Sequence, residues 1–194
     1  MDCQIDKEQI LSLLHELGDE LARNQSFATI NVCGGAAIAI AYNSQKASDD
    51  IDAVLVDFDE RGKFFDCVKQ VAVRHGLPEN WLNEDVKIFV NSLREYSYLD
   101  FGKLGALSIR IASEEQLLAM KLFAARRKDL ADAMLLCKSL NIQTKESLSE
   151  VLEKYFSERS RNFELFRLKD DMRFSDFQDE IISALKEERE LTGC

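Results

Sequence analysis

The sequence has few residues that break secondary structure: one proline, Pro78, and eight glycines among 194 residues. Because these two residue types end most helices and strands, we expect long helices and few irregular stretches. A long apolar run is also missing. The longest one, residues 36–42, is far below the roughly 20 residues that cross a bilayer. Residues 1–20 mix acidic side chains with leucines, unlike a signal peptide. We therefore expect no membrane contact and a cytoplasmic protein.

Residues that bind metals or form disulfides are scarce as well. The two histidines, His15 and His75, have no partner at the spacing of a metal-binding pair, which excludes a zinc site. The five cysteines are odd in number and scattered, as expected of free thiols in a reducing compartment. A net charge of −10 excludes a protein whose main role is to coat nucleic acid, because neutralising phosphates needs a basic face.

Periodic apolar spacing is what the sequence does have, and it predicts an α+β chain. We expect helices over residues 7–23, 36–42, 63–75, 114–125, 130–140, 145–156 and 176–191. We expect strands over residues 27–33, 50–56 and 104–111. The length suits one core with a helical appendage, so we predict a main domain over residues 1–142 and a C-terminal helical extension over residues 143–194, packed on it.

One constellation carries chemistry: Gly34 and Gly35 after a strand, then fourteen residues, then Asp50 and Asp52 on the next strand. Residues i and i+2 of a strand project to one face, so the two carboxylates should lie side by side. They would repel each other unless a divalent cation lay between them, and Mg²⁺ binds one or two carboxylates together with substrate phosphates. The glycines would let backbone N–H groups at a helix start approach a triphosphate.

A Gly-Gly pair alone is more often a plain turn, and an Asp-x-Asp alone is more often a pair of surface carboxylates. The order of the two motifs along the chain favours a functional site. That order resembles the nucleotidyltransferase-like superfamily, whose signature is a Gly-Gly or Gly-Ser turn followed by Asp-x-Asp on the next strand. Two stretches are similar to motifs of its AbiEii-type toxin branch. They are Lys46-Ala47-Ser48-Asp49-Asp50-Ile51-Asp52, and Leu117-Leu118-Ala119-Met120-Lys121-Leu122 followed by Arg126, Lys128, Asp129 and Asp132. Trp81-Leu82-Asn83 fits an uncharacterised subgroup, and the resemblance covers about residues 27–142.

The resemblance implies a short mixed sheet flanked by helices, with a helical C-terminal part. It implies Mg²⁺ or Mn²⁺ on Asp50 and Asp52, and a nucleoside triphosphate over Gly34 and Gly35. The remaining phosphate contacts would come from Lys46, Ser48 and Lys121, with Asp50, Asp52 and Lys121 as the catalytic set.

Two features of the second motif leave alternatives open. Lys121 either points into the same cleft or is a helix-surface lysine. Asp129 and Asp132 lie three apart on one helical face, and pairing with Arg126 or Lys128 as a structural clamp is favoured over catalysis.

The third carboxylate that active members generally carry on a later strand is missing from residues 104–111, which hold Ser108 and Arg110 instead. Asp100 and Asp57 are the candidates to replace it. The resemblance implies transfer of a nucleoside monophosphate to a hydroxyl acceptor, which could be RNA, protein or a small molecule. Such an enzyme could be the toxin of a toxin-antitoxin pair, with a cognate antitoxin as partner. The alternatives are a catalytically silent nucleotide-binding or protein-interaction module and, with less support, an antibiotic-modifying adenylyltransferase.

Overall fold

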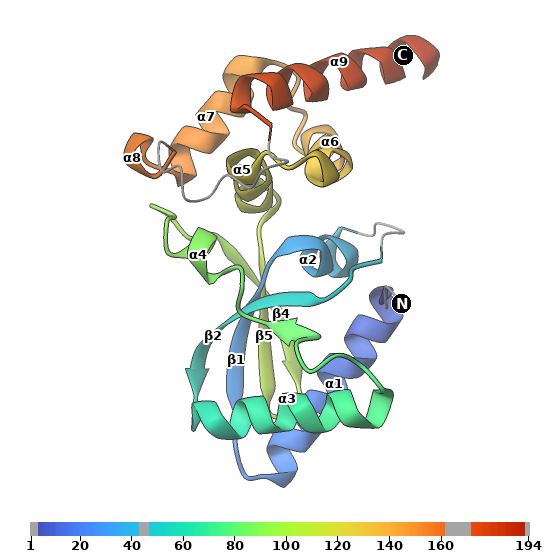
Figure 1. Cartoon of the computed structure of the whole chain (residues 1–194), viewed down its shortest axis with the longest axis vertical. Coiled ribbons are helices and arrows are strands. Elements are labelled where there is room, and N and C mark those ends of the chain that lie inside the picture. Colours follow the sequence, from blue (N-terminus) through green and yellow to red (C-terminus); the bar gives the residue numbers. More distant parts are fainter. Residues whose placement is uncertain (1–3, 43–46, 162–171, 193–194) are drawn as a thin grey trace. The chain divides into compact units, whose positions relative to one another are not determined.

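The structure, a computed structural model, describes residues 4–42, 47–161 and 172–192. The α+β prediction is confirmed: a five-stranded mixed sheet is flanked by helices, and the C-terminal part is helical (Figure 1). The chain forms two compact units. One contains Met1–Ile88 and Tyr98–Ala112, and the other contains Phe89–Ser97 and Ser113–Cys194. The division predicted from the sequence, after residue 142, would lie within the second unit.

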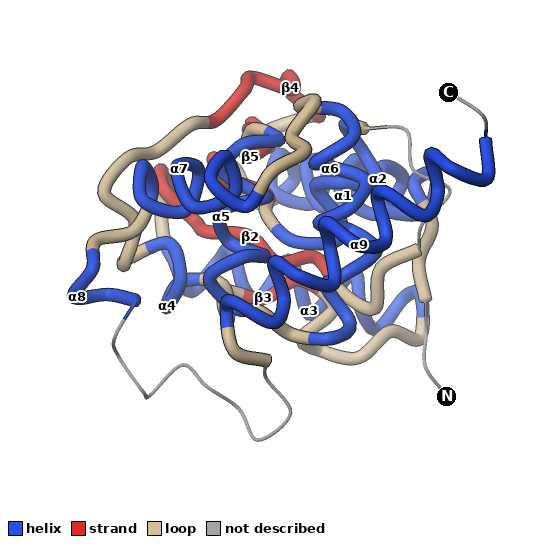
Figure 2. Tube along the Cα trace, turned by 90° about the horizontal axis from the view of Figure 1, so that it is seen from above, coloured by secondary structure: helices blue, strands red, loops and turns tan. Residues whose placement is uncertain are grey.

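The first unit is built on the sheet, whose strand order is β3-β2-β1-β5-β4. Strand β1 is antiparallel to β2 and parallel to β5, β2 is parallel to β3, and β4 and β5 form an antiparallel hairpin. Figure 2 shows β4 and β3 at opposite edges of this sheet. The elements of this unit are α1 (Lys7–Arg23), β1 (Ala28–Val32), α2 (Gly34–Ala41), β2 (Ile51–Phe58), α3 (Arg61–His75), β3 (Leu82–Asn83), β4 (Tyr98–Leu104) and β5 (Leu107–Ala112). Helix α4 (Lys87–Val90) follows β3 where the chain leaves this unit.

One face of the sheet is apolar. Side chains of a strand alternate between its two faces, and the apolar residues of the central strands fall on this one. Ile30 on β1 and its register partner Ile109 on β5 are each at most 1% exposed. Helix α1 packs against β5 and contributes a fully buried stripe, namely Ile10, Leu14, Leu17 and Leu21. This face therefore forms the core of the first unit.

The opposite face carries the polar residues of the central strands. Asn31 on β1 is in register with Arg110 on β5, and Arg110 with Asp100 on β4. Val54 on β2 is also in register with Asn31, so Asp52, two residues before Val54, lies on the same face. We call this side, with its residues Asn31, Asp52, Asp100, Arg110, Thr29 and Ser108, the polar face.

Two glycines let α1 lie directly on the turn between β4 and β5. A Cβ added at Gly18 would lie 1.9 Å from the backbone oxygen of Leu104. One added at Gly105 would lie 2.7 Å from the carbonyl carbon of Gly18, and Ala106 N–H donates to Gly18 O at 3.0 Å. A glycine inside a helix costs about 1 kcal/mol relative to alanine. Here the close approach of the two backbones requires it.

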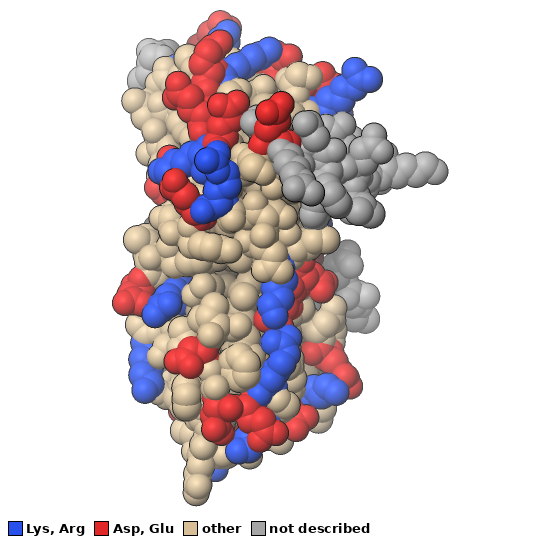
Figure 3. Space-filling model, turned by 90° about the vertical axis from the view of Figure 1, so that its left-hand side faces the viewer, with Lys and Arg blue, Asp and Glu red and all other residues tan. Residues whose placement is uncertain are grey.

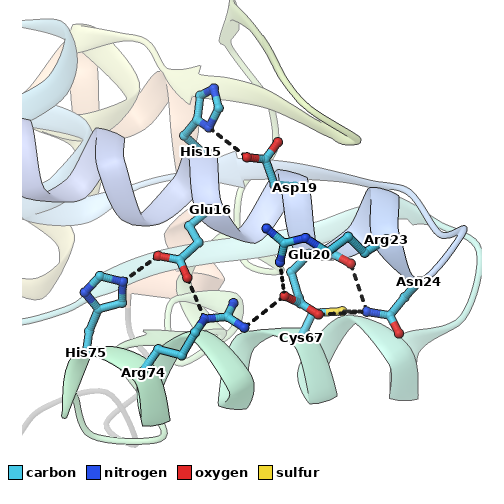
Figure 4. Close-up of polar contacts among 9 residues, drawn as sticks. All are labelled: His15, Glu16, Asp19, Glu20, Arg23, Asn24, Cys67, Arg74 and His75. Atoms are coloured by element: carbon cyan, nitrogen blue, oxygen red, sulfur yellow. Dashed lines mark hydrogen bonds and ion pairs between the residues drawn. The ribbon is translucent and has the colours of Figure 1, made fainter.

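Polar contacts tie α1 to α3 (Figure 4). Arg74 Nε donates to Glu16 at 2.5 Å, and Arg74 also lies 3.0 Å from Glu20, whose side chain is only 8% exposed. His75 Nε2 lies 2.5 Å from the other oxygen of Glu16. The hydrogen bond with His75, helped by Arg74, lowers the pKa of Glu16 below its ordinary value although partial desolvation opposes the shift. These contacts fix the two helices beside each other.

One strand prediction was wrong. Residues 104–111 are not a single strand, because Leu104 ends β4, Gly105 turns the chain with φ +58°, and β5 begins at Leu107. Apolar and polar residues alternate over residues 104–111, and this alternation runs through the turn by coincidence. Strand β4 itself was missed, since Gly102 interrupts its pattern and its residues lie at an edge with little burial. The two-residue strand β3 is too short to show a period.

The second unit is helical. Ser113 caps the start of its first helix and accepts a hydrogen bond from Gln116 N. Aliphatic and aromatic side chains together form its core. Phe156 and Phe177 are fully buried, and the ring of Phe156 stacks on that of Phe123 at 4.1 Å. Its elements are α5 (Glu114–Ala124), the 3-10 helix η1 (Arg127–Asp129), α6 (Leu130–Ser139), α7 (Lys145–Tyr155), α8 (Glu158–Arg161) and α9 (Phe174–Thr192).

Charge is mixed over the surface. On the face drawn in Figure 3, basic and acidic side chains lie close together. Ion pairs among the described residues include those of Arg61 and Lys87 with Glu84, and that of Lys63 with Asp59. Within the described ranges, no helix is long and apolar enough to cross a membrane.

Candidate metal and phosphate site

The glycine turn places two polar side chains against the start of α2. Gly34 has φ +63°, which favours glycine, and a Cβ there would lie 2.8 Å from Asp52 Oδ2. A Cβ on Gly35 would lie 2.9 Å from the hydroxyl oxygen of Ser48. The helix therefore begins at Gly34, two residues earlier than predicted, and the glycines make room for Asp52 and Ser48.

Asp52 is held by the sheet. Its backbone oxygen accepts from Cys33 N at 2.8 Å, and its register partner on β3 is Asn83. The preceding pair, Ile51 and Leu82, is buried, so the Asp52 and Asn83 side chains share the other face.

Asp50 stands one residue before β2 and is joined to the same face by Asn83. Asn83 Nδ2 donates to Asp50 Oδ2 at 3.0 Å. The amide oxygen of Asn83 accepts from Asp85 N at 2.8 Å, which fixes the amide orientation. The structure thus places Asp52 beside Gly34, Ser48 beside Gly35, and Asp50 beside Asn83, the register partner of Asp52.

Asn83 is a residue that sequence reasoning missed at the site. Its signal is the Trp81-Leu82-Asn83 segment, which contributes to the family resemblance but assigns no role to Asn83. Trp81 is 2% exposed and its Nε1 donates to Val68 O on α3 at 3.0 Å. The tryptophan anchors β3, and β3 in turn places Asn83 on Asp50.

The loop that carries Ser48 is tied to the N-terminal segment. Ile5 N donates to Ser48 O at 2.8 Å, and Ser48 N donates to Ile5 O at 2.9 Å. This isolated bridge fixes Ser48, which is 9% exposed. Lys46, predicted to contact phosphate, lies outside the described residues.

Oxygen atoms make up the donor set beside the turn: the carboxylates of Asp50 and Asp52 and the hydroxyl of Ser48. Hard cations such as Mg²⁺ prefer oxygen ligands, so these residues fit the predicted metal. Among the described residues, no three His, Cys, Asp or Glu side chains are arranged to hold one metal ion. The remaining ligands would be water and substrate phosphates, as is usual for Mg²⁺.

Neither candidate for the third carboxylate can share a metal with Asp52. Asp57 lies five residues further along β2, about 17 Å away at roughly 3.3 Å per residue. Asp100 is on β4, three strands from β2, about 14 Å away at roughly 4.8 Å per strand. Cys33 cannot replace the third carboxylate as an anionic ligand or base, since burial raises the pKa of its thiol to about 12.

Lys121 belongs to the second unit, where two carboxylates surround its ammonium. Its Nζ lies 2.5 Å from Asp129 Oδ1 and 2.8 Å from Asp132 Oδ2, and all three residues are at most 7% exposed. Arg126 Nε lies 2.6 Å from Asp129 Oδ2, one of the pairings expected of a clamp. Burial raises the pKa of Asp129, but Lys121 and Arg126 outweigh it, so the pKa is lowered. A phosphate contact of Lys121 stays a prediction.

Comparison of the chain with protein-family models, with curated proteins and with solved structures finds no match.

Proposed function

We propose that this protein is a Mg²⁺-dependent nucleotidyltransferase that moves a nucleoside monophosphate from a triphosphate to a hydroxyl acceptor. The observation that carries the proposal is the pair of contacts at the glycine turn. Gly34 leaves room for Asp52, and Gly35 leaves room for Ser48, at the start of one helix. Both side chains bring oxygen atoms, the ligands that Mg²⁺ prefers, to the start of this helix.

Each residue of the site would have its own chemical role. Asp50 and Asp52 would hold Mg²⁺, which when bound neutralises phosphate charge. Asn83 orients the carboxylate of Asp50. Helix α2 has no side-chain cap at Cys33, so its first N–H groups can donate to a phosphate. Ser48 would add a hydroxyl contact. Rate enhancement would come mainly from positioning and charge neutralisation at the transferred phosphoryl group.

Lys46 and Lys121 enter this proposal through the family resemblance alone. The buried pairs of Lys121 with Asp129 and Asp132 favour a structural role first, because removing one partner of such a cluster leaves uncompensated buried charge.

We place the activity in the cytoplasm, where free thiols persist. If it acts as a toxin, expression of the wild type should arrest growth, and expression of Asp52→Asn should not.

A second candidate is a nucleotide-binding module that has lost transfer. The positions of Asp57 and Asp100, both too far from Asp52 to share its metal, favour it. Such a module would show the same ligand-dependent stabilisation without transferring label to any acceptor.

Thermal melts with and without Mg²⁺ and each triphosphate test the binding step. At a hundredfold excess of ligand over its dissociation constant, the folded state should gain about 2.7 kcal/mol. Asp52→Asn should keep the fold and lose this gain. Asp57→Asn is the matched control, since it makes the same change on the same strand far from the turn. If no triphosphate stabilises the wild type, the proposal fails.

Transfer is tested by incubating the protein with each labelled triphosphate, Mg²⁺ and a cell extract. Label in a protein, RNA or small-molecule fraction that depends on Asp52 would establish the enzyme and its acceptor class. Stabilisation without label transfer would select the silent module instead.

A further inference from the structure

A row of polar side chains crosses the middle of the polar face, beside the carboxylate site. Strand register aligns Asp100 on β4 with Arg110 on β5, and Arg110 with Asn31 on β1. The next position on this row, Val54 on β2, lies two residues from Asp52. Asn31 and Arg110 are therefore neighbours on the same face as Asp52.

Asn31 is unusual within this row. The residue is only 8% exposed, and its Oδ1 atom has no hydrogen-bond partner among the described residues. A buried polar atom without a partner costs about 1–3 kcal/mol. An apolar residue would fit the middle of a sheet better, so the amide needs another reason.

Arg110 is the cationic residue in register with Asn31. Its side chain is 51% exposed, and its contact is a 3.4 Å approach of Nε to Asp100, whose side chain is 89% exposed. Ion pairs this exposed contribute little to stability, with a typical value of about 0–1 kcal/mol. A ligand that offers a better anionic partner could therefore displace Asp100.

We infer that Asn31 and Arg110 form a binding site for a small molecule or chain end that carries an anionic group beside a hydroxyl. Arg110 presents a fork of N–H donors that suits a phosphate or a carboxylate. The neighbouring hydroxyl donates its proton to Asn31 Oδ1 in a hydrogen bond. The two residues thus complement the two halves of one ligand.

The position of this pair suggests that the ligand is the acceptor. Asn31 is one strand and two residues from Asp52, about 8 Å between Cα atoms by the spacing of a sheet. A hydroxyl held by Asn31 would lie next to a phosphate held at Asp52. This assignment rests on the proposed nucleotidyl transfer, whereas anion binding by Arg110 does not.

Binding is tested by calorimetry without Mg²⁺ or triphosphate, using three probes. Glycerol 3-phosphate carries a phosphate beside hydroxyls, 3-hydroxybutyrate carries a carboxylate beside one, and glycerol carries no charge. We expect saturable binding of at least one anionic probe, and the stronger of the two identifies the anionic group. Glycerol should bind at least tenfold more weakly. Equal binding of all three, or of none, overturns the inference.

Variants locate the site. Arg110→Gln should weaken binding of the anionic probe at least tenfold, whereas Lys103→Gln, the same charge change two residue pairs away from this row, should change it less than twofold. Equal losses would mean a diffuse charge effect and overturn the site. Because this binding is measured without Mg²⁺ or triphosphate, probe binding by a protein that no triphosphate stabilises would refute the proposed transfer alone, so that failure of the proposed transfer and failure of this site are distinguishable.

Asn31→Val separates a binding role from a structural one. Valine removes the orphaned oxygen, so the melting temperature of the ligand-free protein should rise while probe binding falls at least tenfold. A lower melting temperature with unchanged probe binding would show that Asn31 only supports the sheet, and would overturn its part in the site.

Discussion

Replacing Gly34 with alanine is the sharpest test of the carboxylate site, because the chain supplies its own control. Gly34 and Gly76 both have φ +63°. A Cβ on Gly34 would lie 2.8 Å from Asp52 Oδ2, whereas one on Gly76 would meet nothing within 4 Å. Both variants carry the same backbone strain, and only Gly34→Ala must displace the Asp52 carboxylate.

Two contributions set the expected change in folding stability of both variants. Holding an L-residue in the left-handed region costs about 1–2 kcal/mol. Loss of glycine freedom in the unfolded chain returns about 0.4–1 kcal/mol. Each variant should therefore lose about 1 kcal/mol of folding stability without ligand. The displaced carboxylate adds a different effect to Gly34→Ala alone, namely loss of the stabilisation by Mg²⁺ and triphosphate.

The assay is a thermal melt of wild type, Gly34→Ala and Gly76→Ala, with and without Mg²⁺ and the triphosphate that stabilises the wild type most. We expect Gly76→Ala to keep the full ligand-dependent rise and Gly34→Ala to lose most of it. Should Gly34→Ala keep the rise, contact between the turn and Asp52 has no role in binding. Should both variants lose it, the effect is general destabilisation.

Three further predictions concern the framework. Gly18→Ala should destabilise the protein by roughly 1–3 kcal/mol or more in urea denaturation, because its Cβ would lie 1.9 Å from the Leu104 backbone oxygen. The control is Gly62→Ala in α3, whose Cβ would meet nothing closer than 3.6 Å and which should be neutral or stabilising. The pKa of Glu16 is lowered from its ordinary 4.5 by a hydrogen bond from the histidine that ends α3. Its stabilisation is present above pH 4.5 and is lost as the pH falls through the lower folded pKa. The stability gap between wild type and Glu16→Gln should therefore close in acid melts, and a gap that widens contradicts the contact. Lys121→Met should cost about 3–5 kcal/mol, because the buried carboxylates of Asp129 and Asp132 both lose the ammonium and Arg126 remains beside Asp129 alone. An unchanged denaturation midpoint would show that the cluster is not structural.

Local rules allowed part of this protein to be predicted from its sequence. Helix α1 spans Lys7–Arg23, the range that its apolar spacing predicts, and the cap at Ser113 starts α5. The glycine turn and the spacing of Asp50 and Asp52 indicated a site on one face. These features depend on residues a few positions apart, where helix and strand periods fix the geometry.

Tertiary structure decided what depends on residues far apart in the chain. The Trp81-Leu82-Asn83 segment draws attention to Asn83, but only strand pairing shows that Asn83 reaches Asp50 across 33 positions. Strand order alone separates Asp100 from Asp52, and strand register places Arg110 beside Asn31. The sequence by itself therefore determined which side chains could bind a metal and a phosphate. The order and register of the strands, set by long-range packing of α1 on one face, decided which of them stand together.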